Sequence, residues 1–161
     1  KSGARVLSAD MWPADEETAE RLRIRAGQPV YRLRRLRLAD GAPLAIELTR
    51  ISFIGCERLL NYDLAQESLY HLLETVFDIP VLDADQELQA DLATGDESTL
   101  LHVPIGSPVL RTSRVMSTRR NHPVEYATSV YRGDKYRFYT RLARDPRQQT
   151  GTKGGPPAIE S

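Results

Sequence analysis

Two arginines in one segment of the chain are the side chains best suited to bind a small acidic molecule. Arg35 and Arg37 stand two positions apart in residues 30–39, where apolar and basic residues predict a β-strand. Side chains at this spacing point to the same face of a strand, together with Tyr31 and Leu33. Guanidinium pairs bind phosphate or carboxylate by paired hydrogen bonds. The alternative is a solvated strand edge that is ion-paired to Glu47 and contributes little to stability.

Two glutamates are expected on the strands that return toward such a site. Glu47 lies four residues after Pro43, and Glu125 lies two residues after Pro123. Both separations are even, and side chains alternate between the two faces of a strand, so the two glutamates occupy corresponding faces of their strands. One face of the second strand then presents Glu125, Ala127, Ser129 and Tyr131. Small residues between a carboxylate and a phenol are typical of a pocket floor rather than of a packed core. The sequence therefore predicts a cavity with guanidinium groups at one end and carboxylates elsewhere.

A repeated motif indicates which elements position these residues. The pattern G-x-P-V-x-R-x-x-R occurs at Gly27–Arg35 and again at Gly106–Arg114, 79 positions later. Acidic segments precede both copies, and a proline follows each of them. Each copy reads as a capped helix, a turn, a strand, a polar turn and a second strand. We interpret this as a duplicated helix-hairpin unit, the alternative being chance recurrence of a common turn before a strand.

The remaining elements follow from hydrophobic periodicity. We expect helices over residues 15–24 and 94–103, and an amphipathic helix from Ser68 that stops at Pro80. Asp40-Gly41 predicts a hairpin turn. Strands are expected at residues 6–9, 30–39, 44–51, 82–92, 108–118, 124–131 and 136–142, the one at 82–92 half-buried. Strands joined by short turns favour an α+β fold with an antiparallel sheet and few helices.

Composition narrows the function classes. The 161 residues suit one domain, and 22 basic and 22 acidic residues give no net charge. A chain without basic excess is poorly suited to grip nucleic acid by itself. One cysteine, three histidines without ligand spacing and no nucleotide-binding or nucleophile motif predict no metal, no cofactor and no catalytic residues. No apolar run is long enough to span a membrane, and we expect a cytoplasmic protein.

The ordered set of motifs resembles the UTRA domain of HutC-subfamily GntR transcription regulators, whose fold is like that of chorismate lyase. The resemblance covers about residues 4–143. It rests on four stretches, none of which is specific alone: residues 27–37, residues 40–47, Ser68-Leu69-Tyr70, and residues 106–111 continuing through 123–126 to 130–138. We expect residues 145–161, rich in Pro, Gly, Gln and Thr, to be a disordered or loosely attached tail.

The resemblance implies a site and a function. It places Arg35, Arg37, Ser68 and Tyr70 at the acidic end of a small effector, such as a phosphosugar. It places Glu47, Glu125 and Tyr131 near hydroxyl or amide groups, with Ser8 as a further contact. It implies a bacterial effector-sensing domain, a homodimer, controlling a winged helix-turn-helix DNA-binding domain that would precede Lys1. The alternatives are a chorismate lyase-like enzyme acting on a small dicarboxylate and a purely structural dimerisation module.

Overall fold

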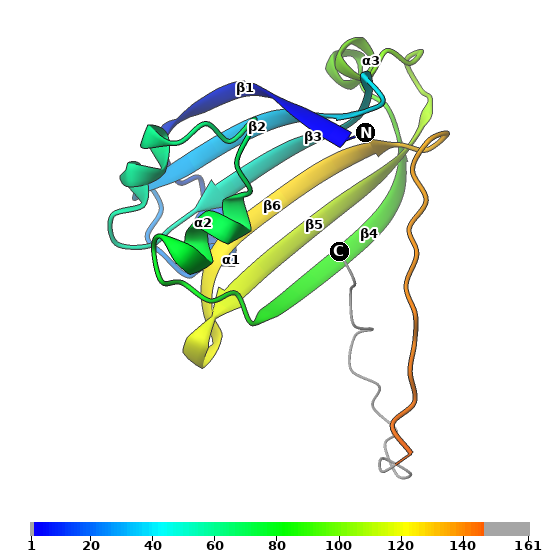
Figure 1. Ribbon diagram of the computed structural model, residues 1–161. Coiled ribbons are helices and arrows are strands. Elements are labelled where there is room, and N and C mark those ends of the chain that lie inside the picture. Colours follow the sequence, from blue (N-terminus) through cyan, green and yellow to red (C-terminus); the bar gives the residue numbers. More distant parts are fainter. Residues whose placement is uncertain (1, 147–161) are drawn as a thin grey trace.

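The fold is an antiparallel sheet of six strands with three short α-helices, as predicted (Figure 1). The computed structural model describes residues 2–146. The order across the sheet is β1-β2-β3-β6-β5-β4. The strands are β1 Ser2–Pro13, β2 Pro29–Ala39, β3 Ala42–Ile51, β4 Asp83–Leu92, β5 Pro108–Thr118 and β6 His122–Arg132. The helices are α1 Glu16–Leu22, α2 Leu69–Thr75 and α3 Gly95–Leu101, with 3₁₀ turns η1 Cys56–Asn61 and η2 Arg119–Asn121.

The duplicated unit is confirmed and accounts for the strand order. One half runs β1-α1-β2-β3, and the other runs β4-α3-β5-β6. The halves meet where β3 and β6 pair antiparallel at the centre of the sheet. The hairpin between β2 and β3 turns at Asp40 and Gly41, whose φ values of 51° and 80° suit a turn in the left-handed region.

The first helix of each half begins at the predicted cap. The Asp15 carboxylate accepts a hydrogen bond of 2.7 Å from the Thr18 backbone N–H, and Thr94 with Glu97 forms a capping box. Both helices end earlier than predicted. Each terminates at a left-handed residue, Arg23 or His102, and the glycines of the repeated motif serve the turns that follow.

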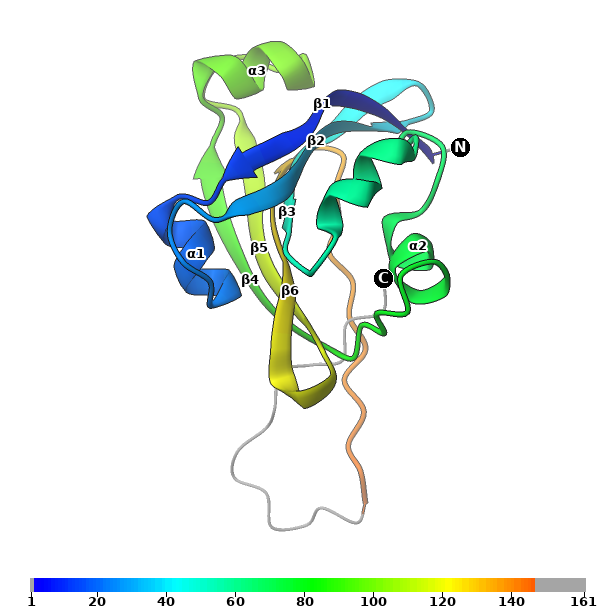
Figure 2. The ribbon, with the colours of Figure 1, turned by 90° about the vertical axis from the view of Figure 1, so that its left-hand side faces the viewer.

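Different elements cover the two faces of the sheet (Figure 2). On one face α1 packs near Val30 and Tyr126, and α3 packs near Leu36 and Val109. On the other face α2 and η1 cover the first half of the sheet. The cluster there includes buried Cys56, the chain's only cysteine, together with Tyr31, Leu33, Leu59, Leu72 and Leu73. This second face holds the cavity described below.

Several predicted elements differ from the structure. Residues 136–142 form no strand: both sides of β6 are already paired, with β3 and β5, and the segment pairs with neither edge strand, β1 or β4. The strand β4 is mostly exposed rather than half-buried, since it lies at the edge of the sheet. The α2 helix ends at Thr75, well before Pro80. The predicted tail lies almost wholly outside the described residues, within which no helix is long and apolar enough to cross a membrane.

The cap of α1 gives a testable prediction. Replacing Asp15 by Ala should lower the free energy of unfolding by about 1 kcal/mol at neutral pH. The Thr18 backbone N–H holds the pKa of Asp15 below its ordinary 3.8. A carboxylate whose folded pKa is lowered stabilises the fold above its ordinary pKa, and this contribution disappears as pH falls through the folded value. Urea unfolding should therefore show the variant converging on the wild type in acid, and Asp15→Asn should retain most of the cap.

Candidate functional site

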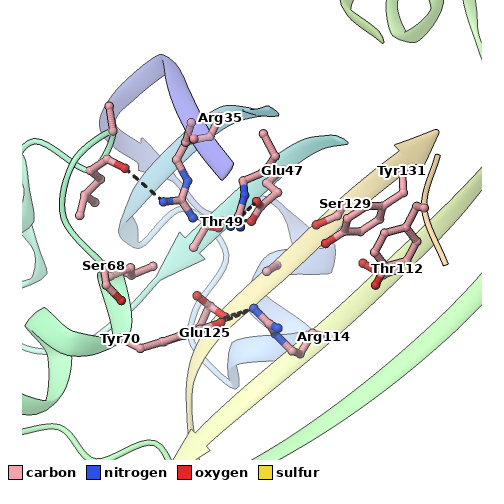
Figure 3. Close-up of a pocket in the computed structure, with 18 of the residues that line it drawn as sticks. Arg35, Glu47, Thr49, Ser68, Tyr70, Thr112, Arg114, Glu125, Ser129 and Tyr131 are labelled. Atoms are coloured by element: carbon pink, nitrogen blue, oxygen red, sulfur yellow. Dashed lines mark hydrogen bonds and ion pairs between the residues drawn. The ribbon is translucent and has the colours of Figure 1, made fainter. Parts of the chain in front are cut away.

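A cavity of about 910 Å³ lies on the sheet face beside α2 (Figure 3). Its floor is made by β2, β3, β6 and β5, and one wall is the segment 64–70 that leads into α2. Residues 136–139, after β6, contribute another part of the lining. The cavity spans the junction of the two halves, so both repeats contribute side chains to it.

Strand register explains which side chains meet on the floor. Directly opposed positions form a row of Arg35, Glu47, Ser129 and Thr112 across four strands. The next row on the same face contains Thr49, Ala127, Arg114 and Gln86. Opposed residues of antiparallel strands share a face, which is why residues far apart in sequence converge here.

The first charged cluster joins β2 to β3. Glu47 lies 3.6 Å from Nη2 of Arg35 through Oε2, and 3.1 Å from Nη1 of Arg37 through Oε1. Nη1 of Arg35 also donates to the Leu64 carbonyl at 3.2 Å. The side chains of Arg35 and Glu47 are each 11% exposed, whereas that of Arg37 is 44% exposed. The solvated-edge alternative predicted an ion pair with Glu47, and this ion pair exists. Arg35 and Glu47 form it inside the cavity rather than on a solvated edge.

The second cluster joins α2 to β5 and β6. The Tyr70 hydroxyl donates to Oε1 of Glu125 at 2.9 Å and accepts a hydrogen bond from Nη2 of Arg114. The same Arg114 nitrogen lies 3.5 Å from Oε1 of Glu125. Burial raises the pKa of Glu125, which is 1% exposed, against the opposing effect of the Arg114 charge. Burial and the neighbouring Glu125 likewise raise the pKa of Tyr70, which keeps its proton.

Four buried polar atoms of the cavity residues lack an aligned hydrogen bond to any described residue. They are Nε of Arg35, Nε of Arg114, Oε1 of Glu47 and Oε1 of Gln86. Buried polar groups in folded proteins are nearly always paired. Glu47 Oε1 already takes part in the ion pair with Arg37, so the groups left without a partner among the described residues are two guanidinium donors and the Gln86 amide oxygen. Because these atoms are buried, a ligand would bind them only after the side chains shift toward the cavity.

The structure brings together most of the predicted site residues. The cavity lining includes Arg35, Arg37, Glu47, Ser68, Tyr70, Glu125 and Tyr131. Ser68 also caps α2, since its hydroxyl oxygen accepts from the His71 backbone N–H at 3.4 Å. Ser8 is not among the lining residues. A register shift between Val6 and Ser8 places Ser8 opposite Arg34. Arg34 and Arg35 are neighbours in one strand and face opposite sides of the sheet, so Ser8 does not lie on the cavity face with Arg35. The binding roles of the other seven stay predictions.

The second repeat contributes a cavity residue that the predictions did not include. The predicted cationic end contains only Arg35 and Arg37 of the first copy, and the second copy has Met116 at the position equivalent to Arg37. Arg114, the counterpart of Arg35, nevertheless lines the same cavity. The repeat itself indicated this position, because Arg114 occupies the place in the second half that Arg35 occupies in the first. The two halves pair at the centre of one sheet, so equivalent residues face the same side of it. Thr49, Gln86 and Thr112 carried no comparable signal, because isolated polar residues in strands are common.

Comparison with known proteins defines the family. The profile of the UTRA domain matches residues 1–137, and the chain belongs to this family, the effector-binding domain of GntR-family transcription regulators. It is 35% identical over 142 residues to the HTH-type transcriptional repressor NagR of Bacillus subtilis, a match that covers 88% of this chain and 58% of NagR. It is 25% identical over 133 residues to the repressor MngR of Escherichia coli, covering 83% of this chain and 55% of MngR. The chain thus spans little more than half the length of these relatives.

Solved structures show the same fold. The C-terminal domain of the histidine utilization repressor from Pseudomonas syringae superimposes with a TM-score of 0.81 at 25% identity, covering 89% of this chain and all of that one. The effector domain of PhnF from Mycobacterium smegmatis gives a TM-score of 0.83 at 24% identity, covering 89% and 88%. Within residues 2–146, no group of three or more His, Cys, Asp or Glu side chains is placed to hold a metal ion.

The buried Glu125 gives a prediction about pH. A carboxyl group whose folded pKa is raised favours the fold most below its ordinary pKa of 4.5, and this contribution is lost as pH rises through the folded value. Urea unfolding of the wild type and Glu125→Gln should show the wild type losing stability relative to the variant as pH rises from about 4 toward neutrality. A difference that stays constant over this range would contradict the raised pKa.

Proposed function

We propose that this domain senses a small anionic effector, such as a phosphosugar, and that the effector occupies the cavity between the two halves of the sheet. The observation that carries the proposal is the arrangement of Arg35 and Arg114. Both guanidinium groups face one cavity from different halves, and each has a buried Nε without a hydrogen bond to a described residue. Guanidinium groups bind phosphate and carboxylate in a fixed, paired geometry.

The rest of the lining suits the polar part of such an effector. Glu47 and Glu125 accept hydrogen bonds, and Tyr131 and Ser129 offer hydroxyl groups on the floor. Tyr131 stacks on Tyr136 with ring centroids 3.9 Å apart, which closes part of the cavity with aromatic surface. A ligand with an acidic group at one end and hydroxyl or amide groups along its length would satisfy this lining.

The names of two relatives support a small-molecule effector. MngR is named as the repressor of a mannosyl-D-glycerate transport and metabolism system, and another relative, 27% identical over 139 residues, is the histidine utilization repressor of Pseudomonas putida. Both names refer to small metabolites. For this chain they support a soluble metabolite as the effector, without identifying which one.

Regulation would act through linkage to a DNA-binding domain. In our proposal the domain is a cytoplasmic homodimer without catalytic activity, and a separate winged helix-turn-helix domain contacts DNA. Effector binding favours one arrangement of the dimer and changes operator affinity, with a coupling free energy of typically about 1–3 kcal/mol. The linkage is reciprocal, so operator DNA would change effector affinity by the same factor.

The proposal is tested by ligand binding to paired variants. A panel of phosphosugars, neutral sugars and small carboxylic acids should include compounds that raise the melting temperature of the wild type. Arg35→Ala should weaken binding of an acidic hit about 10- to 100-fold, since hydrogen bonds to charged groups contribute about 1.5–3 kcal/mol. Arg34→Ala is the matched control, because Arg34 lies on the same strand, is not among the lining residues and precedes Arg35 directly.

Two outcomes would count against the proposal. One is a panel without a single hit. The other is an acidic hit that binds Arg35→Ala as tightly as it binds Arg34→Ala. Incubation with chorismate addresses the enzymatic alternative, and we expect no 4-hydroxybenzoate to form. Product formation at enzymatic rates would replace the sensing function with catalysis.

A further inference from the structure

Glu125 stands at the boundary between the cavity and the apolar cluster under α2. The residues directly opposite it are Ile51 on β3 and Met116 on β5, and neither side chain can donate a hydrogen bond to a carboxylate. Tyr31 on β2 continues this row opposite Ile51. Glu125 lines the cavity, yet it is almost fully buried. A carboxyl group in such surroundings has lost most of its hydration, which disfavours its charged form.

Three ionisable side chains act on Glu125 from the elements around it. Nη2 of Arg114, on β5, lies 3.5 Å from Oε1, and the Tyr70 hydroxyl, on α2, donates to the same oxygen at 2.9 Å (Figure 3). Glu47, on β3, adds a like charge from farther away. Burial raises the pKa of Glu125, Arg114 and Tyr70 oppose this rise, and Glu47 adds to it. Among the described residues, Arg114 is thus the one cation that forms an ion pair with Glu125.

The charge that stabilises ionised Glu125 is also the charge that an acidic effector would use. The Arg114 side chain lines the cavity and is 28% exposed. Its 3.5 Å contact with Glu125 is longer than the roughly 2.8 Å of a strong charge-assisted hydrogen bond. An effector anion at Arg114 would place a second negative charge beside Glu125. Two like charges in one buried site disfavour each other's ionisation, and the relief available here is a proton on Glu125.

The hydrogen bonds at Tyr70 can accommodate this proton. The Tyr70 hydroxyl donates to Glu125 while accepting from Arg114. A protonated Glu125 carries an O–H of its own, which can donate to the Tyr70 oxygen and reverse the bond between them. The reversal frees the Tyr70 O–H, which belongs to the cavity lining, to donate to a ligand. The proton therefore converts an internal hydrogen bond into a donor that is available to the effector.

We propose that Glu125 takes up one proton when an acidic effector binds in the cavity, and that neutral Glu125 and Tyr70 then act together as hydrogen-bond donors at this end of the site. Glu125 is thereby a specificity-determining residue, since a donor selects effector atoms that accept. This inference rests on the proposed effector site and adds a rule for its pH dependence. By linkage, the dissociation constant rises up to tenfold for each pH unit between the pKa of Glu125 in the free domain and its higher pKa in the complex.

Calorimetric titration with inorganic sulfate tests the proton uptake. The charge of sulfate does not change from about pH 5 to about pH 8, so the probe contributes no titration of its own. Chloride holds the ionic strength constant, because salt screens charge interactions. Titrations in two buffers of different ionisation enthalpy count the protons taken up. We expect the wild type to take up as much as one proton and to bind sulfate several-fold more weakly at the upper pH.

Two variants assign the proton to its residue. Glu125→Gln keeps the shape of the side chain but cannot titrate, so we expect no proton uptake and a dissociation constant that is independent of pH. Glu47→Gln is the matched control, because it makes the same change in the same cavity at a carboxylate that contacts Arg35 and Arg37. We expect it to retain the proton uptake. The three histidines titrate in this range, but none lines the cavity.

The outcomes separate this inference from the proposed function. Sulfate binding without proton uptake in the wild type, or with equal uptake in Glu125→Gln, would overturn the role of Glu125 and leave the anion site intact. Sulfate that does not bind, or that binds Arg35→Ala and Arg114→Ala as tightly as the wild type, would overturn the anion site and this inference with it. The buffer comparison needs only the wild type, so the test holds even if Glu125→Gln does not fold.

Discussion

The pairing of β3 with β6 is the contact on which the site depends. It is the only strand pairing that joins the two halves in the described sheet, and its register sets Glu47 opposite Ser129. Through this pairing the rows of each half continue into the other, so Arg35 and Arg114 face one cavity. A slip of one residue would turn every side chain of one half to the opposite face. The hydrophobic faces packed under α1, α3 and α2 oppose such a slip, since it would expose both cores.

Charge burial in the cavity is better suited to recognition than to stability. Removing ion pairs from water costs several kcal/mol for each ion, and the attraction within the pair often only offsets that cost. Glu125 and Arg114 are held in this way, with Tyr70 between them. Because Tyr70 belongs to α2, this network also ties the helix to the second half of the sheet. A ligand that competes for Arg114 would therefore act on the position of α2 as well as on the floor.

Local sequence signals predicted most of the architecture. The caps at Asp15 and Thr94, the Asp40-Gly41 turn and the duplicated motif each depend on residues close in sequence, and each is confirmed. Strand parity alone placed Glu47, Glu125 and Tyr131 on the cavity face. The exceptions depended on longer-range information. Ser8 lies opposite Arg34 because of an irregularity in β1, and residues 136–142, predicted as a strand, pair with no strand of the described sheet.

The single cysteine has a practical consequence for following motion in this domain. Cys56 begins η1 and is 4% exposed within the cluster that joins η1 and α2 to the sheet. A thiol in this position reacts with an alkylating reagent only when the cover opens. Its rate of modification therefore measures how often η1 and α2 open away from the sheet, by local opening or by global unfolding. The native sequence thus contains its own reporter, positioned next to the helix that carries Tyr70.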